Sequence, residues 1–86
     1  MGSGRRRYTT SADYLRMLRR MTAAAGRRVS EADAEELAEL IAIRDDLDGV
    51  IRRAVAGLRE DGYTWESIGA ATGTSRQAAQ QKWGRA

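Results

Sequence analysis

The sequence predicts an all-α protein, with an N-terminal helix, a long central helix and a pair of short C-terminal helices. Proline is absent from the 86 residues, and the abundant Ala, Leu, Arg and Glu are good helix formers. Apolar residues recur at spacings of three and four positions instead of alternating, which is the helical period. A chain of this length corresponds to one domain, near the lower limit for a self-sufficient hydrophobic core.

Composition narrows the chemistry that the chain can perform. Cysteine and histidine are both absent, so the sequence offers no disulfide, no thiolate metal site and no histidine as general base or metal ligand. We therefore expect no enzyme activity, no cofactor and no small-molecule ligand. No apolar run approaches the length of a membrane span and no secretory signal is evident, so we expect a cytoplasmic protein without a membrane partner.

Charge is distributed in three blocks along the chain. Residues 1–30 carry eight arginines against Asp13, a net +7, and residues 31–48 carry eight acids against Arg44, a net −7. Residues 49–86 carry six basic groups against three acids, a net +3. This asymmetry predicts that the basic blocks can bind phosphates and that the acidic block turns away from a nucleic acid.

The first ten residues are predicted to form a disordered basic arm. Met1-Gly2-Ser3-Gly4 resembles a remnant of cloning, and the three arginines that follow have no apolar residue to anchor them. Two interpretations stay open for Arg5, Arg6 and Arg7: an arm along the phosphates or in a minor groove, or a solvated tail.

The first helix is predicted to run from a cap at Thr10 or Ser11 to about Ala25, where Gly26 ends it. Arginines occupy its outer side. Its apolar stripe has the helical spacing and is expected to pack in the core. The stripe consists of Tyr14, Met17, Leu18, Met21 and Ala25, widened by Leu15.

A long helix is predicted to follow, from a capping box at residues 30–33 to about Glu60. Gly49 falls opposite its apolar seam, so one continuous helix is favoured, with two helices meeting near Asp48 as the alternative. Asp61-Gly62 is a turn signal that stops the helix. The seam has a seven-residue spacing: Leu37, Leu40, Arg44, Leu47, Ile51, Ala54 and Leu58.

Two interpretations are open for what packs against the apolar seam over residues 37–58. In one interpretation residues 11–48 form an antiparallel helical hairpin, which brings the arginines at 16, 19 and 20 near the acids at 35, 36 and 39. In the other, the seam also pairs with a second copy of the chain and forms a homodimer. Arg44 either pairs with an acid across an interface or marks the exposed edge of the seam.

Residues 49–86 are predicted to form a compact unit of three helical elements within the single domain 11–86. Thr64 caps a short helix, Gly73 ends it in the left-handed conformation, and Ser75 caps the last helix, residues 75–84. A small core is expected from all three elements: Ile51, Ala54, Val55, Leu58, Trp65, Ile68 and Ala79.

The last helix sorts its side chains onto two faces. At 100° per residue, Ala78 and Ala79 fall on one side with the stem of Lys82, and Trp83 lies at the boundary. Small residues there, and Gly69 on the preceding helix, allow the two helices to approach closely. The opposite face carries the long polar side chains of Arg76, Gln77, Gln80 and Gln81.

This segment resembles the helix-turn-helix of small DNA-binding regulators from high-GC Gram-positive bacteria and their phages. It is also similar to the promoter-reading C-terminal domain of sigma factors. The likeness covers roughly the last forty residues and rests on Trp65, Ile68, Gly69, Gly73, Ser75, Arg76, Gln77, Ala78 and Ala79. Many motifs of this kind place a branched aliphatic residue where Ala79 stands, so the core is expected to rely on Trp65 and Trp83.

The sorted faces and the resemblance together predict a transcriptional regulator that reads double-stranded DNA with helix 75–84 in the major groove. A base contact is expected from Arg76 to guanine; Gln77 and Gln81 either pair with adenine or contact phosphates, and Gln80 is a further candidate. Such a protein would be associated with the nucleoid. Phosphate contacts are expected from Thr64, Thr74, Ser75, Lys82 and Arg85.

The alternative function is a protein-interaction adaptor. In that interpretation the acidic helix 31–48 contacts RNA polymerase or a partner regulator, because a helix-turn-helix fold does not by itself establish DNA binding.

Overall fold

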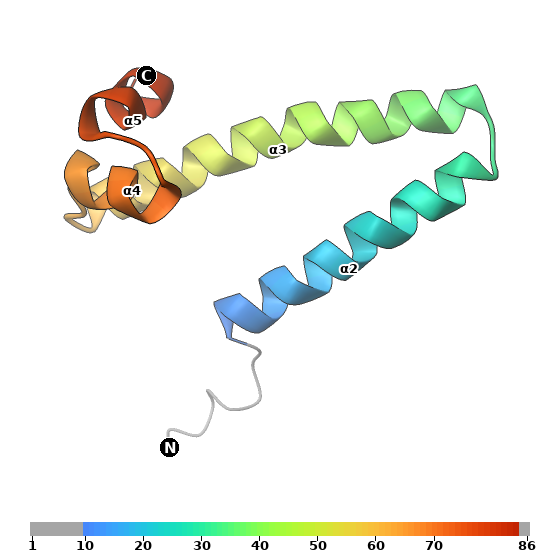
Figure 1. The fold of residues 1–86 in the computed structure, drawn as a ribbon, viewed down its shortest axis with the longest axis horizontal. Coiled ribbons are helices and arrows are strands. Elements are labelled where there is room, and N and C mark those ends of the chain that lie inside the picture. The colour runs from blue at the N-terminus through green and yellow to red at the C-terminus, as the bar shows by residue number, and fades with distance from the viewer. Residues whose placement is uncertain (1–9, 85–86) are drawn as a thin grey trace. The chain divides into compact units, whose positions relative to one another are not determined.

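The computed structural model describes residues 10–84, and within that part of the chain it contains four helices and no strand (Figure 1). The predicted all-α class is therefore confirmed. The helices are α2 (Ser11–Ser30), α3 (Ala34–Glu60), α4 (Trp65–Thr72) and α5 (Arg76–Trp83). None of these helices is long and apolar enough to cross a membrane. The arginines of the basic arm and Arg85 lie outside the described residues.

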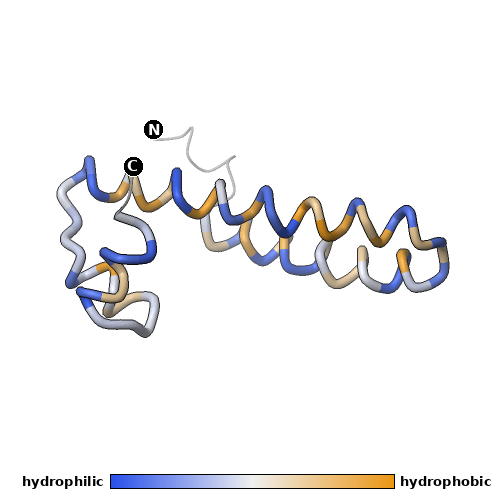
Figure 2. The backbone as a smooth tube through the Cα atoms, turned by 90° about the horizontal axis from the view of Figure 1, so that it is seen from above, coloured by the Kyte–Doolittle hydropathy of each residue, from blue (hydrophilic) through white to orange (hydrophobic). Residues whose placement is uncertain are grey.

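The chain divides into two compact units, Met1–Ala42 and Ile43–Ala86, and the boundary falls inside α3. We call them unit 1, which contains α2 and the first turns of α3, and unit 2, which contains the rest of α3 with α4 and α5. Figure 2 shows hydrophobic and hydrophilic residues recurring turn by turn along α2 and α3. Both long helices are therefore amphipathic, as the spacing predicts.

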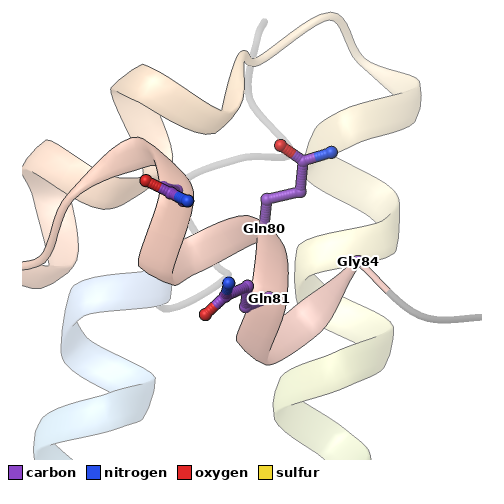
Figure 3. A pocket seen from close by; sticks show the side chains of 4 residues that line it. Gln80, Gln81 and Gly84 are labelled. Atoms are coloured by element: carbon purple, nitrogen blue, oxygen red, sulfur yellow. The ribbon is translucent and has the colours of Figure 1, made fainter.

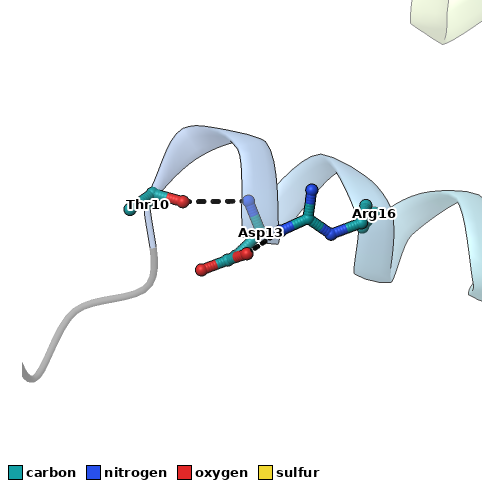
Figure 4. Close-up of polar contacts among 3 residues, drawn as sticks. All are labelled: Thr10, Asp13 and Arg16. Atoms are coloured by element: carbon teal, nitrogen blue, oxygen red, sulfur yellow. Dashed lines mark hydrogen bonds and ion pairs between the residues drawn. The ribbon is translucent and has the colours of Figure 1, made fainter.

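The start of α2 matches the prediction, and its end does not. The Thr10 side chain accepts a hydrogen bond from the N–H of Asp13 at 3.1 Å, and the Asp13 carboxylate pairs with Arg16 one turn later (Figure 4). The predicted stop at Gly26 is wrong, because α2 continues to Ser30. A glycine inside a helix costs only about 1 kcal/mol, which the flanking helical residues offset.

The cap of α3 lies three residues after the predicted position. Ser30 is the last residue of α2, and its hydroxyl donates to the carbonyl of Arg27 at 2.7 Å. Asp33 caps instead, since its carboxylate accepts the N–H of Glu36 at 3.1 Å. From there α3 runs without a break to Glu60, so the prediction of one continuous helix is confirmed.

The apolar stripe of α2 is exposed to solvent. Tyr14 and Met21 are 57% and 60% exposed, and no residue of this helix is buried. The prediction that the stripe packs in a core is therefore wrong for the single chain. The ion pairs of the described residues join only neighbours in sequence, Arg16 to Asp13 and Arg44 to Asp45, and the Arg44 side chain is exposed. This exposure agrees with Arg44 marking the edge of the seam.

The buried core lies in unit 2 and is small. Val55 of α3, Ile68 of α4 and Ala79 of α5 are buried together, with Trp65 and Trp83 packed against them. An eight-residue helix is only about 12 Å long, so α4 and α5 cover a short length of α3. For that reason three residues predicted for this core are exposed instead: Ile51, Ala54 and Leu58.

Candidate nucleic-acid interface

Two reciprocal hydrogen bonds hold the start of α4. The hydroxyl of Thr64 accepts the N–H of Ser67 at 3.0 Å, and the N–H of Thr64 donates to the hydroxyl of Ser67 at 3.1 Å. The prediction of Thr64 as the cap is confirmed. Ser67 was not predicted, although the Thr-x-x-Ser spacing resembles a capping box with serine in place of the usual Glu or Gln.

A glycine turn ends α4 and leads into α5. Gly73 has a φ of 77°, the left-handed conformation predicted for it. The N–H of Thr74 donates to the carbonyl of Gly69 at 2.8 Å, and the N–H of Gly73 donates to the carbonyl of Ala70 at 3.4 Å. This pair of bonds is the Schellman arrangement, which satisfies the last carbonyls of the helix and reverses the chain within three residues.

The turn passes directly over Gly69. A Cβ atom at this position would lie 2.8 Å from the carbonyl oxygens of both Thr74 and Ser75. The predicted close approach is therefore confirmed, and the backbone that makes it is the turn before α5. Gly69 allows the turn, and with it the first residue of α5, to lie against α4.

Ser75 and Ala79 orient α5. The hydroxyl of Ser75 accepts the N–H of Ala78 at 3.0 Å, which confirms Ser75 as the cap. Ala79 is 0% exposed, and Ala78 and Trp83 are half-buried. The helix thus packs through its small residues, and the remaining side faces outward.

The outward side of α5 carries all four residues predicted to read bases. Arg76, Gln77, Gln80 and Gln81 are exposed. The three glutamines and Gly84 line a shallow open hollow on this side, and Figure 3 shows Gln80 and Gln81 projecting from the helix. One short helix therefore presents a guanidinium and three primary amides to solvent together.

The residues predicted to contact phosphates are positioned at the ends of α4 and α5. Thr64 and Ser75 accept capping bonds, and each hydroxyl keeps its own hydrogen as a donor. Thr74 is half-buried in the turn. Lys82 is exposed near the end of α5, with its ammonium 5.3 Å from the centre of the Trp83 ring.

Two arginines of α3 support this unit, and neither was predicted to do so. The Arg59 guanidinium lies 4.8 Å from the centre of the Trp65 ring and donates to the carbonyl of Tyr63 at 3.0 Å. Arg52 donates to the carbonyl of Lys82 at 3.4 Å. These contacts fasten the start of α4 and the end of α5 to α3. Arg52 and Lys82 are 30 positions apart, so no local sequence pattern predicts their contact.

No group of acidic, histidine or cysteine side chains in residues 10–84 has the arrangement to hold a metal ion. No protein-family model, curated protein or solved structure matches the chain. The chemistry of the exposed α5 face is therefore the basis for assigning a function.

Proposed function

We propose that the protein binds double-stranded DNA in a sequence-specific manner, as a transcriptional regulator, with α5 in the major groove. The observation that carries this proposal is the division of α5 between fully buried Ala79 and an exposed face of Arg76 and glutamines. An α-helix with its side chains is about 10–12 Å wide, and the major groove is about 12 Å wide. The buried alanine fastens the helix, and the opposite face is free to enter the groove.

The side chains on that face match the hydrogen-bonding pattern of base edges. In the proposal, Arg76 donates two hydrogen bonds to O6 and N7 of guanine, and Gln77 and Gln81 pair with N6 and N7 of adenine. Gln80 projects from the same face and is a further candidate. Thr64, Thr74, Ser75 and Lys82 contact phosphates and set the register.

The proposal includes a homodimer through the apolar seam over residues 37–58 and association with the nucleoid. Two copies bring two recognition helices to two half-sites, which gives a helix-turn-helix protein more contact than one helix supplies. The seam has the exposure that a second copy needs, since Leu37 and Leu47 are 49% and 44% exposed.

The test is selection of bound duplexes from a random pool, followed by substitution of Arg76. We expect Arg76→Ala to weaken binding to the selected duplex by about 1–3 kcal/mol, and to change binding to random duplex far less. Arg53→Ala is the matched control, because it removes an exposed arginine from α3. An equal loss on both duplexes in Arg76→Ala would reduce this residue to a phosphate contact.

A salt titration separates the proposal from the adaptor alternative. DNA binding through cationic side chains weakens as the salt concentration rises, because counterions must be displaced. If the full chain fails to bind mixed duplex DNA even at low salt, the DNA proposal fails and an adaptor with the acidic helix 31–48 takes its place.

A further inference from the structure

The two long helices carry a large apolar surface that no described residue covers. Twelve large apolar side chains of α2 and α3 are 38–60% exposed. Together they expose on the order of several hundred Å² of apolar area, divided between the two helices, and exposed apolar stripes of this kind mark interaction sites. They are Tyr14, Leu15, Met17, Leu18, Met21, Leu37, Ile41, Ile43, Leu47, Val50, Ile51 and Leu58.

The charges beside these apolar side chains have opposite signs on the two helices. α2 carries five arginines against Asp13, a net +4, and α3 carries six acids against Arg44 up to Asp48, a net −5. At 100° per residue, Arg19 and Arg28 fall beside the α2 stripe, next to Leu15 and Met21. Glu36, Glu39 and Asp46 fall along one edge of the α3 seam.

We propose that two copies of the chain form a four-helix interface in which α2 of each copy packs against the acidic half of α3 of the other. This inference rests on the homodimer included in the proposed function and specifies its surfaces. It adds α2 to the interface, and it makes the pairing of basic with acidic edges the feature that selects the partner.

A second copy suits this surface because the surface is self-complementary. In a two-fold interface both subunits use the same patch, so the patch must contain two parts that are complementary to each other. Each chain carries a basic helix, α2, and a helix with an acidic half, α3, each with exposed apolar side chains. In a dimer, α2 of each chain can therefore pair with α3 of the other, which gives two equivalent pairings. Charged edges that flank an apolar seam also set which helices pair, as in coiled coils.

The experiment reverses the charges on one helix at a time and then mixes the two variants. The first variant is Arg19→Glu with Arg28→Glu, and the second is Glu36→Lys with Glu39→Lys and Asp46→Lys. Sedimentation equilibrium of the full chains without DNA gives the mass, and circular dichroism reports that each variant remains helical. The matched control, Arg53→Glu with Glu60→Lys, reverses exposed charges on α3 outside the proposed pairing.

We expect the unchanged chain and the control to sediment at twice the 9.5 kDa chain mass. Each reversed variant alone faces like charge with like charge, so its dimer dissociation constant should rise at least about tenfold. An equimolar mixture should recover the dimer, because each variant supplies the sign that the other lost.

Three results would overturn the proposal: a monomeric mass for the unchanged chain at 100 µM, undiminished dimers in both reversed variants, or a mixture that stays monomeric. The last result is the one expected if α2 and α3 pair only within their own chain. No DNA is present, so a failure here is distinct from a failure of the Arg76 experiment, which tests DNA recognition alone.

Discussion

Gly69 and Gly57 differ only in their surroundings, and those surroundings decide what a single methyl group would do. At Gly69 the methyl would meet the carbonyl oxygens of Thr74 and Ser75 at 2.8 Å, and backbone cannot rotate away as a side chain can. At Gly57, inside α3, no atom outside the local helix backbone lies within 4 Å of the added carbon. The same substitution should therefore have opposite effects at the two positions.

Gly69→Ala should destabilise the fold, and Gly57→Ala should stabilise it. We expect a loss of about 1–3 kcal/mol from the first, because the turn must shift away from α4. The second should gain about 0.5–1 kcal/mol, since alanine loses less backbone entropy than glycine in a helix. Urea denaturation of the two variants measures both changes. A Gly69→Ala chain as stable as the original would show that the turn does not depend on this close approach.

Ala79 is a small residue at the centre of the core, and larger residues pack around it. It is fully buried between α3 and α4, and the half-buried Trp65 and Trp83 complete the packing around it. The departure from a branched aliphatic residue at this position thus coincides with two large aromatic rings nearby. The expectation that the core relies on Trp65 and Trp83 is confirmed.

At the scale of elements, α4 and α5 depend on their caps and on packing. Each is eight residues long, whereas an isolated helix shorter than about 12–15 residues is only marginally stable in water. Thr64 with Ser67, and Ser75 alone, satisfy backbone N–H groups that would otherwise be free. The start of α5 in particular is set by the cap at Ser75.

Substitution of Ser75 separates its role as a cap from its predicted role at a phosphate. Ser75→Ala should lower stability by about 1 kcal/mol, because the N–H of Ala78 loses its acceptor. Ser75→Asp keeps an acceptor, and the negative charge suits the positive end of the helix, so its stability should be preserved.

The two Ser75 variants should differ in DNA binding. The carboxylate of the aspartate variant would repel a neighbouring phosphate, so we expect weaker binding to random and selected duplex alike. Denaturation and binding titrations of the same two samples give both readings. Full DNA affinity in Ser75→Asp would remove this residue from the phosphate contacts.

At the scale of the whole molecule, the apolar surface is divided unequally. Every buried residue of the described chain lies in unit 2, while the stripe of α2 in unit 1 is exposed. Burial of apolar area is the main favourable term in folding. The stability of the helices in unit 1 should therefore depend on association with a second chain.

Association makes stability depend on protein concentration. If the homodimer forms, a 100-fold dilution should lower the midpoint of thermal unfolding by on the order of 5–10 °C, since mass action then favours separated chains. Circular dichroism melts at the two concentrations measure the shift. The chain with Arg19 and Arg28 changed to glutamate is the control and should show a much smaller shift. A midpoint independent of concentration in the unchanged chain would contradict association.

Local chemistry made much of this protein predictable from its sequence. The all-α class, the continuous α3, the caps at Thr64 and Ser75 and the left-handed Gly73 all follow from helical periodicity and from backbone groups satisfied within a few residues. The exposed face of α5 was predictable for the same reason, because 100° per residue separates the alanines from Arg76 and the glutamines.

The tertiary structure decided the features that depend on distant residues or on competition between local signals. Gly26 carried a signal for a helix end and Ser30 a signal for the start of the next helix, and α2 continues through the first and ends at the second. Arg52 holds the end of α5 to α3 through a contact with Lys82, 30 positions away, which no local spacing predicts. Val55 is buried while Ile51 and Leu58 are exposed, because periodicity marks an apolar stripe but only a packed neighbour determines which of its residues leave water.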